Sequence, residues 1–165
     1  MNALPAPVAV AQTRQEELIQ LVSFNLSGEE YGVEVLSVRE IIRMSTITKM
    51  PNTPYFVEGI INLRGKVIPI IDLRKRFGLE EQEPDSKTRI MVMDDGKGLT
   101  GLVVDSVSEV IRIHGSEIQP PPPLISENIS QEFIAGVFNH ADRLLIVMNS
   151  HRMFNEDEQG YLASC

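Results

Sequence analysis

The sequence predicts an all-β fold built from two copies of one unit, and three observations support this prediction. About ten short apolar segments alternate with turns rich in glycine, asparagine and aspartate, which is typical of β-strands. Residues 32–44 match residues 101–113 at seven of thirteen positions, an offset of 69. Residues 56–77 match residues 133–154 in the same order at an offset of 77. Two ordered matches at similar offsets indicate a duplicated unit of about five strands, and strands this short suit small barrels that close their own edges.

The first copy begins with alternating apolar residues over 20–36, which predict a hairpin with a turn at Ser27-Gly28-Glu29-Glu30. The next segment is ambiguous. Val38, Ile41 and Ile42 are spaced as in a short helical turn, but an irregular strand fits them equally well.

After a break at 50–54 that holds two prolines, the apolar segments 57–63 and 67–71 predict a second hairpin with Arg64-Gly65-Lys66 at its tip. Asp72 is then expected to cap a short helix over 73–77, which Gly78 ends. A polar connection over 80–87 joins this copy to the next.

The second copy repeats this order. Residues 90–93 and 99–104 flank an Asp-Asp-Gly-Lys-Gly turn, and residues 133–138 and 144–148 flank a turn at 140–143. Asn149 and Ser150 supply cap-type residues at the place of Asp72. The proline run Pro120–Pro123 is interpreted as a stiff loop, with a polyproline ligand as the alternative.

Length and composition bound the organisation and the partners. We expect tails at 1–15 and 156–165 around two barrel subdomains, 16–88 and 89–155, with strand exchange between them left open. The net charge of −8 argues against nucleic acid as the partner. No apolar run approaches the roughly 18 residues of a membrane span. The sole cysteine, Cys165, offers no disulfide framework, which fits a cytoplasmic protein.

The two copies diverge most informatively at one turn. The first copy reads Asn62-Leu63-Arg64-Gly65, whereas the second reads Asn139-His140-Ala141-Asp142. If the fold required Arg-Gly at this turn, the second copy would be expected to keep it. Arg64 is therefore better explained by something that only the first copy does, such as binding.

The string from Gly59 to Leu73 (GIINLRGKVIPIIDL) resembles the signature of the CheW family of chemotaxis coupling proteins. The segments Glu30–Gly32, Asn52–Pro54, Val103–Asp105 and Asp142–Ile146 also resemble it, so that the similarity covers about residues 17–155. The resemblance implies two pseudo-symmetric five-stranded SH3-like β-barrels with short helices.

The resemblance also implies a function without catalysis or a cofactor. CheW-type proteins couple the cytoplasmic tips of methyl-accepting chemoreceptors to the regulatory domain of the histidine kinase CheA. They work in the cytoplasm at membrane-bound receptor arrays, without inserting into the membrane, and some self-associate in rings. Such a chain would act as a scaffold in signal transduction.

Nine residues are the resulting candidates for receptor or kinase binding. Arg64 is the first, with Glu40 as the partner that orients it and Gly65 as a turn glycine of positive φ. An apolar groove between the barrels is expected to involve Val38, Ile41, Val104 and Val107, although such residues are more often core. Leu36 and Ile47 are candidates for a kinase-facing patch.

Enzyme and metal functions find little support in the sequence. The three histidines are scattered without a partner at ligand spacing, and no nucleophile or phosphate-loop motif is present. Two alternatives to the chemotaxis adaptor stay open. One is a similar scaffold in a different receptor–kinase pathway, and the other is a small-ligand sensor that uses the groove between the barrels.

Overall fold

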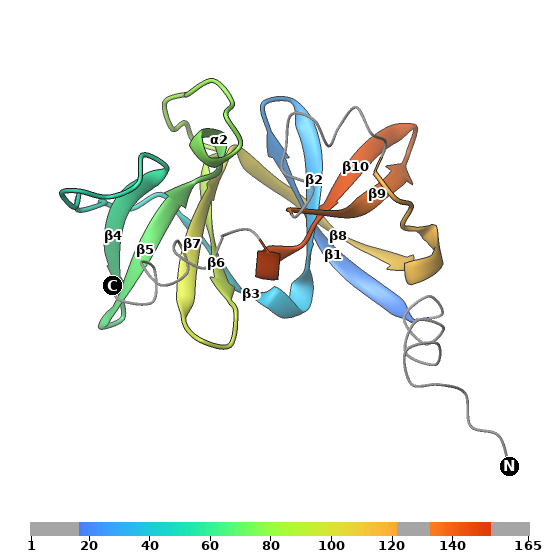
Figure 1. Cartoon of the computed structure of the whole chain (residues 1–165), viewed down its shortest axis with the longest axis horizontal. Helices are drawn as coiled ribbons and strands as arrows, with labels where there is room; N and C mark the ends of the chain where they lie inside the picture. Colours follow the sequence, from blue (N-terminus) through green and yellow to red (C-terminus); the bar gives the residue numbers. More distant parts are fainter. Residues whose placement is uncertain (1–16, 122–132, 153–165) are drawn as a thin grey trace, which may run out of the picture.

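The computed structural model describes residues 17–121 and 133–152, and their strands form two sheets side by side (Figure 1). In chain order the elements are β1 (Leu18–Leu26), β2 (Glu29–Glu34), η1 (Val35–Ser37), β3 (Val38–Arg43), β4 (Val57–Leu63), β5 (Lys66–Asp72), α2 (Leu73–Arg76), β6 (Arg89–Asp94), β7 (Leu99–Val104), β8 (Ser106–His114), η2 (Gly115–Glu117), β9 (Ile134–His140), β10 (Arg143–Met148) and η4 (Ser150–Arg152). The predicted all-β class is confirmed.

The two sheets exchange strands between the copies. One sheet has the order β3-β6-β7-β5-β4 and the other β8-β1-β2-β10-β9; we call them barrel I and barrel II. They do not coincide with the ranges 16–88 and 89–155, because β1 and β2 pair with strands of the second copy. The reason is that β2 finds its parallel partner in β10, and β7 finds its own in β5.

The duplication inferred from the sequence is confirmed strand by strand. When each strand of barrel II is replaced by its counterpart in the other copy, the order of barrel I results. The two parallel pairings are also equivalent, since Ile70 lies opposite Gly101 and Val147 lies opposite Gly32. Each barrel therefore contains two strands of one copy and three of the other.

An isolated bridge closes each sheet into a barrel. Thr48 pairs with Ile60 in barrel I, and Gln119 pairs with Val137 in barrel II. Close approach of the chain at these bridges explains one glycine in each copy. A Cβ on Gly59 would lie 2.1 Å from the carbonyl oxygen of Thr48, and one on Gly136 would lie 2.6 Å from that of Gln119.

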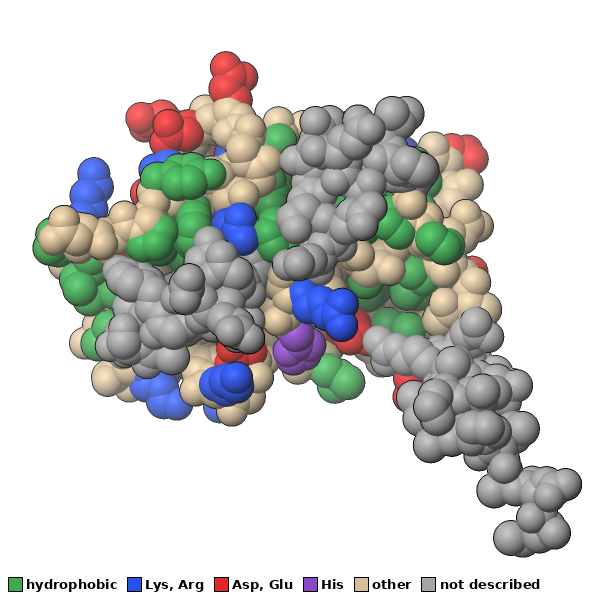
Figure 2. Space-filling model, viewed as in Figure 1, with side chains coloured by type: hydrophobic (Ala, Val, Ile, Leu, Met, Phe, Trp, Pro, Cys, Tyr) green, Lys and Arg blue, Asp and Glu red, His purple; other side chains and the backbone are tan. Residues whose placement is uncertain are grey.

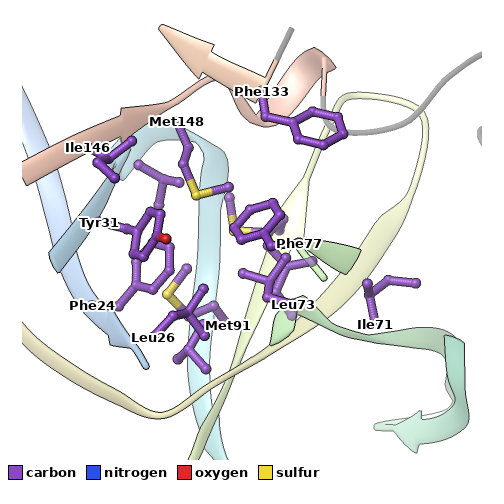
Figure 3. Close-up of a cluster of buried hydrophobic side chains, with 14 of the residues drawn as sticks. Phe24, Leu26, Tyr31, Ile71, Leu73, Phe77, Met91, Phe133, Ile146 and Met148 are labelled. Atoms are coloured by element: carbon purple, nitrogen blue, oxygen red, sulfur yellow. The ribbon is translucent and has the colours of Figure 1, made fainter. Parts of the chain in front are cut away.

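Three apolar clusters hold the molecule together. One fills barrel I and includes Ile68 and Val92, and another fills barrel II and includes Leu21 and Val147. The largest cluster draws buried side chains from both barrels, and the residues labelled in Figure 3 are Phe24, Leu26, Tyr31, Ile71, Leu73, Phe77, Met91, Phe133, Ile146 and Met148. We call it the inter-barrel core, and it joins the two barrels through buried apolar contacts.

The ambiguous segment of the sequence contains both alternatives in succession. Residues 35–37 form a 3-10 turn, and Val38 begins strand β3. The first turn is tighter than predicted, because Ser27 and Gly28 alone take positive φ and Glu29 already belongs to β2. The predicted tails, 1–15 and 156–165, and Pro122–Pro123 lie outside the described residues.

The short helix after β5 forms as predicted, one residue shorter. The backbone N–H of Arg74 donates to the Asp72 carboxylate at 2.9 Å, and Gly78 ends the helix with φ +72°. Burial raises the pKa of Asp72, although this capping hydrogen bond acts in the opposite direction. Among the described residues, no helix is long and apolar enough to cross a membrane.

Candidate functional site

Arg64 sits at the tip of the β4–β5 hairpin, in a two-residue turn that both copies share. Arg64 and Gly65 have φ of +51° and +86°, the combination that suits the twist of a hairpin. The side chain of Asn62 accepts a hydrogen bond from the N–H of Gly65 at 2.9 Å. The second copy makes the same turn with Ala141 and Asp142, at +50° and +67°. The fold therefore does not require arginine here.

The guanidinium of Arg64 is held by Glu40, as expected from the sequence. Its two terminal nitrogens donate to the two carboxylate oxygens of Glu40, each at 2.7 Å. The Arg64 side chain is 70% exposed and that of Glu40 is 28% exposed. The Arg64 hydrogen bond, more than the neighbouring charges, lowers the pKa of Glu40. A planar fork fixed in this way can present its remaining N–H groups to a partner.

The equivalent position of the second copy lacks this arrangement. Glu109 is the counterpart of Glu40 and is exposed on β8, but the counterpart of Arg64 is Ala141. Because an alanine offers no charge, the ion pair belongs to the first copy alone. The sequence difference between the two turns therefore corresponds to a structural difference: the Arg64 turn carries an ion pair and the Ala141 turn does not.

A β-bulge in β3 determines to which side of the strand the side chains of Val38 and Ile41 point. Val38 lies opposite Met93 and Ile41 lies opposite Met91, so four residues of β3 face three of β6. This extra residue turns Val38 and Ile41 to the same side, toward the inter-barrel core. Val38 packs against that core, whereas Ile41 remains 40% exposed.

The second copy repeats the bulge in β8. Val107 lies opposite Phe24 and Val110 lies opposite Val22, with the same extra residue. Val107 packs against the inter-barrel core, and Val110 is 55% exposed. Sequence reasoning missed Val110, although the offset of 69 that relates Val38 to Val107 relates Ile41 to Val110.

One of the apolar candidates is placed differently from expectation. Val104 is only 1% exposed and belongs to the inter-barrel core rather than to a groove surface. It ends strand β7, where sequence alone does not separate core from surface. Ile47 is half-buried in the connection between β3 and β4, where it packs against the interior of barrel I next to Gly59. Leu36, in contrast, is 95% exposed.

A cavity of about 440 Å³ lies beside α2, and its lining is mostly charged. Lys75 forms an ion pair with Glu58 at 2.7 Å, and Arg74 forms one with Asp105. Acidic side chains also gather over the loop that follows α2 (Figure 2). Among the described residues, no group of three or more potential metal ligands occurs. An apolar pocket with a few polar groups is the usual small-molecule site, and this lining differs from it.

A charged hairpin tip and exposed apolar residues on a double barrel are typical of a protein-interaction module. Comparisons with known proteins identify the family to which this interaction module belongs. The family model described as "CheW-like domain" matches residues 20–158. The chain therefore belongs to the CheW-like family, whose members are chemotaxis coupling adaptors.

Individual relatives agree with this assignment. The chain is 36% identical to the chemotaxis protein CheW of Treponema pallidum, over 96% of this chain and 92% of that protein. It is 31% identical to protein FrzA of Myxococcus xanthus, over 81% of each. The crystal structure of the scaffolding protein TtCheW from Thermoanaerobacter tengcongensis has a TM-score of 0.78 and 39% identity, covering 86% of this chain and 91% of that one.

Proposed function

We propose that this chain couples the cytoplasmic tips of chemoreceptors to the regulatory domain of the kinase CheA. One observation carries the proposal: among the described residues of a duplicated fold, only the first copy presents an exposed arginine fixed by a two-fold hydrogen bond to a carboxylate. Because the fold does not need this pair, its purpose lies outside the fold. Membership of a family of adaptors supplies the class of partner.

The receptor surface in this proposal combines the Arg64–Glu40 pair with the apolar side chains on the bulged strands. Val38, Ile41 and Val107 were expected there, and Val110 joins them by its exposure. A helical receptor tip would lay its apolar side chains against these residues and its polar ones against the Arg64 fork.

The kinase surface in this proposal is centred on Leu36, whose side chain is almost fully exposed. Burial of such an exposed leucine against a partner removes apolar surface from water. A partner on each of two faces makes the adaptor bivalent, and linked weak contacts give an array its avidity. Contact through both barrels would extend such an array into rings in the cytoplasm, beneath the membrane-bound receptors.

The test is binding of purified CheA and of a receptor-tip fragment to the wild type, to Arg64→Ala and to Leu36→Ser. We expect Arg64→Ala to weaken receptor binding and Leu36→Ser to weaken kinase binding. The matched control is Arg143→Ala, since Arg143 is exposed beside the equivalent turn of the second copy. Circular dichroism checks that each variant is folded.

Three results would contradict parts of the proposal. Unchanged binding by Arg64→Ala would remove the pair from the receptor surface. No binding of either partner by the wild type would assign the adaptor to a different receptor–kinase pathway. A small metabolite that stabilises the protein in a thermal-shift screen would favour the sensor.

A further inference from the structure

The chain passes between the two barrels at only two places within the described residues. One crossing is the 3-10 turn 35–37, between β2 of barrel II and β3 of barrel I. The other is a single residue, Asp105, between β7 of barrel I and β8 of barrel II. These crossings are equivalent under the duplication, so Leu36 is the counterpart of Asp105.

At the Asp105 crossing, a buried arginine side chain holds the chain through hydrogen bonds. Arg74 extends from α2 and is 8% exposed. Its Nε donates to one carboxylate oxygen of Asp105 at 2.7 Å, and one terminal nitrogen donates to the other oxygen at 2.5 Å. The same guanidinium donates to the carbonyl of Glu80 at 2.7 Å and to the side chain of Gln82 at 2.6 Å. All three of its nitrogens are thus engaged.

Asp105 in turn ties the crossing to barrel II. Its carboxylate accepts from the backbone N–H of Ser27 at 2.8 Å, and its own N–H donates to the carbonyl of Asn25 at 3.0 Å. Ser27 belongs to the β1–β2 turn of barrel II, whereas Arg74 belongs to the helix after β5 of barrel I. One carboxylate therefore joins elements of both barrels.

At the equivalent crossing, the described counterparts of Asp105 and Arg74 form no such hydrogen bonds. Its counterpart of Asp105 is Leu36, which is 95% exposed, and the counterpart of Arg74 is His151, which is also exposed. A leucine side chain cannot accept a hydrogen bond. The two crossings thus differ in the chemistry that restrains them.

We propose that Arg74 is a positioning residue that, through Asp105, sets the angle between the two barrels. Val107 follows Asp105 by two residues on β8, so this angle also sets where Val107 and Val110 lie relative to Val38 and Ile41. Motion between the barrels is then centred on the Leu36 crossing. Only the consequence for receptor binding rests on the proposed function.

The test measures the distance between the barrels directly. Nitroxide labels are placed on Val67→Cys and Leu144→Cys, in a background with Cys165→Ser. These positions are equivalent, one on each barrel, and are 51% and 54% exposed. Pulsed electron spin resonance then gives the distribution of label distances in the otherwise wild-type chain, in Arg74→Lys and in Asp105→Asn.

We expect both variants to give a broader or shifted distribution, because lysine lacks the two-pronged fork and asparagine lacks the charge. The matched control is Lys75→Gln. Lys75 neighbours Arg74 on the same helix, but its ion pairs with Glu58 of β4 and with Glu81 join no element of barrel II. This control should keep the wild-type distribution. Thermal melts confirm that every variant is folded at the temperature of labelling.

An unchanged distribution in both folded variants would overturn the inference. Receptor-tip binding measured on the same variants should weaken several-fold for Arg74→Lys and stay unchanged for Lys75→Gln. If the wild type binds no receptor tip, the proposed function fails, while the distance distributions still decide the role of Arg74.

Discussion

Arg64 has a backbone conformation that residues other than glycine rarely adopt. Its φ of +51° is imposed by the hairpin twist, because Ala141 has nearly the same value in the second copy. The left-handed conformation costs about 1–2 kcal/mol for such a residue. The first copy thus places a long charged side chain at a position where glycine or asparagine would be more stable, which is expected of a residue kept for binding.

The first prediction concerns the acid that orients this arginine. Arg64→Ala should raise the pKa of Glu40 back toward its ordinary value of 4.5, because the Arg64 hydrogen bond is the main cause of its lowering. A lowered pKa in the fold stabilises the protein above the ordinary value, and this contribution is lost as the pH falls through the folded pKa. The Arg64–Glu40 pair should therefore persist below pH 4.5.

Carboxyl carbon chemical shifts, followed by NMR from pH 2 to pH 7, measure this titration. Arg39→Ala is the control, since Arg39 acts on Glu40 only through its charge and contributes least to the lowering. Its effect should be clearly smaller. A Glu40 pKa that is the same in wild type and Arg64→Ala would show that the pair does not form in solution.

At the scale of elements, the bulged strands show where sequence reasoning reaches its limit. The spacing of Val38 and Ile41 is that of one helical face, but a bulge produces the same three-residue spacing in a strand. The hairpins and the Asp72 cap follow from local turn chemistry and were predictable. A bulge depends on the partner strand, so the local pattern could not decide between helix and strand.

The second prediction concerns the bridge that closes barrel I. Gly59→Ala should destabilise the protein strongly, because its Cβ would lie 2.1 Å from a backbone oxygen and its φ of +148° disfavours side chains. Gly65→Ala should cost only about 1–2 kcal/mol, since no atom lies within 4 Å of its added Cβ. Urea unfolding of the wild type, Gly59→Ala and Gly65→Ala measures the loss of unfolding free energy in each variant.

Gly136→Ala provides the matched comparison in barrel II. Its Cβ would also collide with backbone, at 2.6 Å, but without an unfavourable φ. Its loss of stability should fall between the other two. Equal stability of Gly59→Ala and Gly65→Ala would show that the Thr48–Ile60 bridge is not closed in solution.

At the scale of the whole molecule, the inter-barrel core is larger than the apolar cluster inside either barrel. Phe77 stacks on Phe133 and lies 5.9 Å, between ring centroids, from Tyr31 of barrel II. Such contacts could not be predicted, because each strand pattern indicates only that a face is buried. The exchange of strands is hidden for the same reason: the two copies have the same pattern, and local sequence does not tell a strand which copy to join.

The third prediction is that the two barrels unfold together. Phe77→Ala should lower the free energy of unfolding by about 3–5 kcal/mol, and it should do so for both barrels, since Phe77 belongs to the core that they share. Amide hydrogen exchange at Val92 of barrel I and Val147 of barrel II reports each barrel separately.

Ile68→Val provides the control for an ordinary core change, because Ile68 packs inside barrel I alone. It should cost about 1 kcal/mol. If Phe77→Ala speeds exchange at Val92 and leaves Val147 protected, the barrels are separate folding units and the prediction fails.

The exchange of strands also governs the order in which the protein can be completed during synthesis. Strand β2 emerges from the ribosome well before its parallel partner β10, which follows all the other described strands. Glu30 pairs with Leu145, so this edge of the first hairpin stays open until β10 has been translated. Barrel I, whose last strand is β7, can form before barrel II is complete. It then provides a surface against which the β1–β2 hairpin can pack until β10 is made.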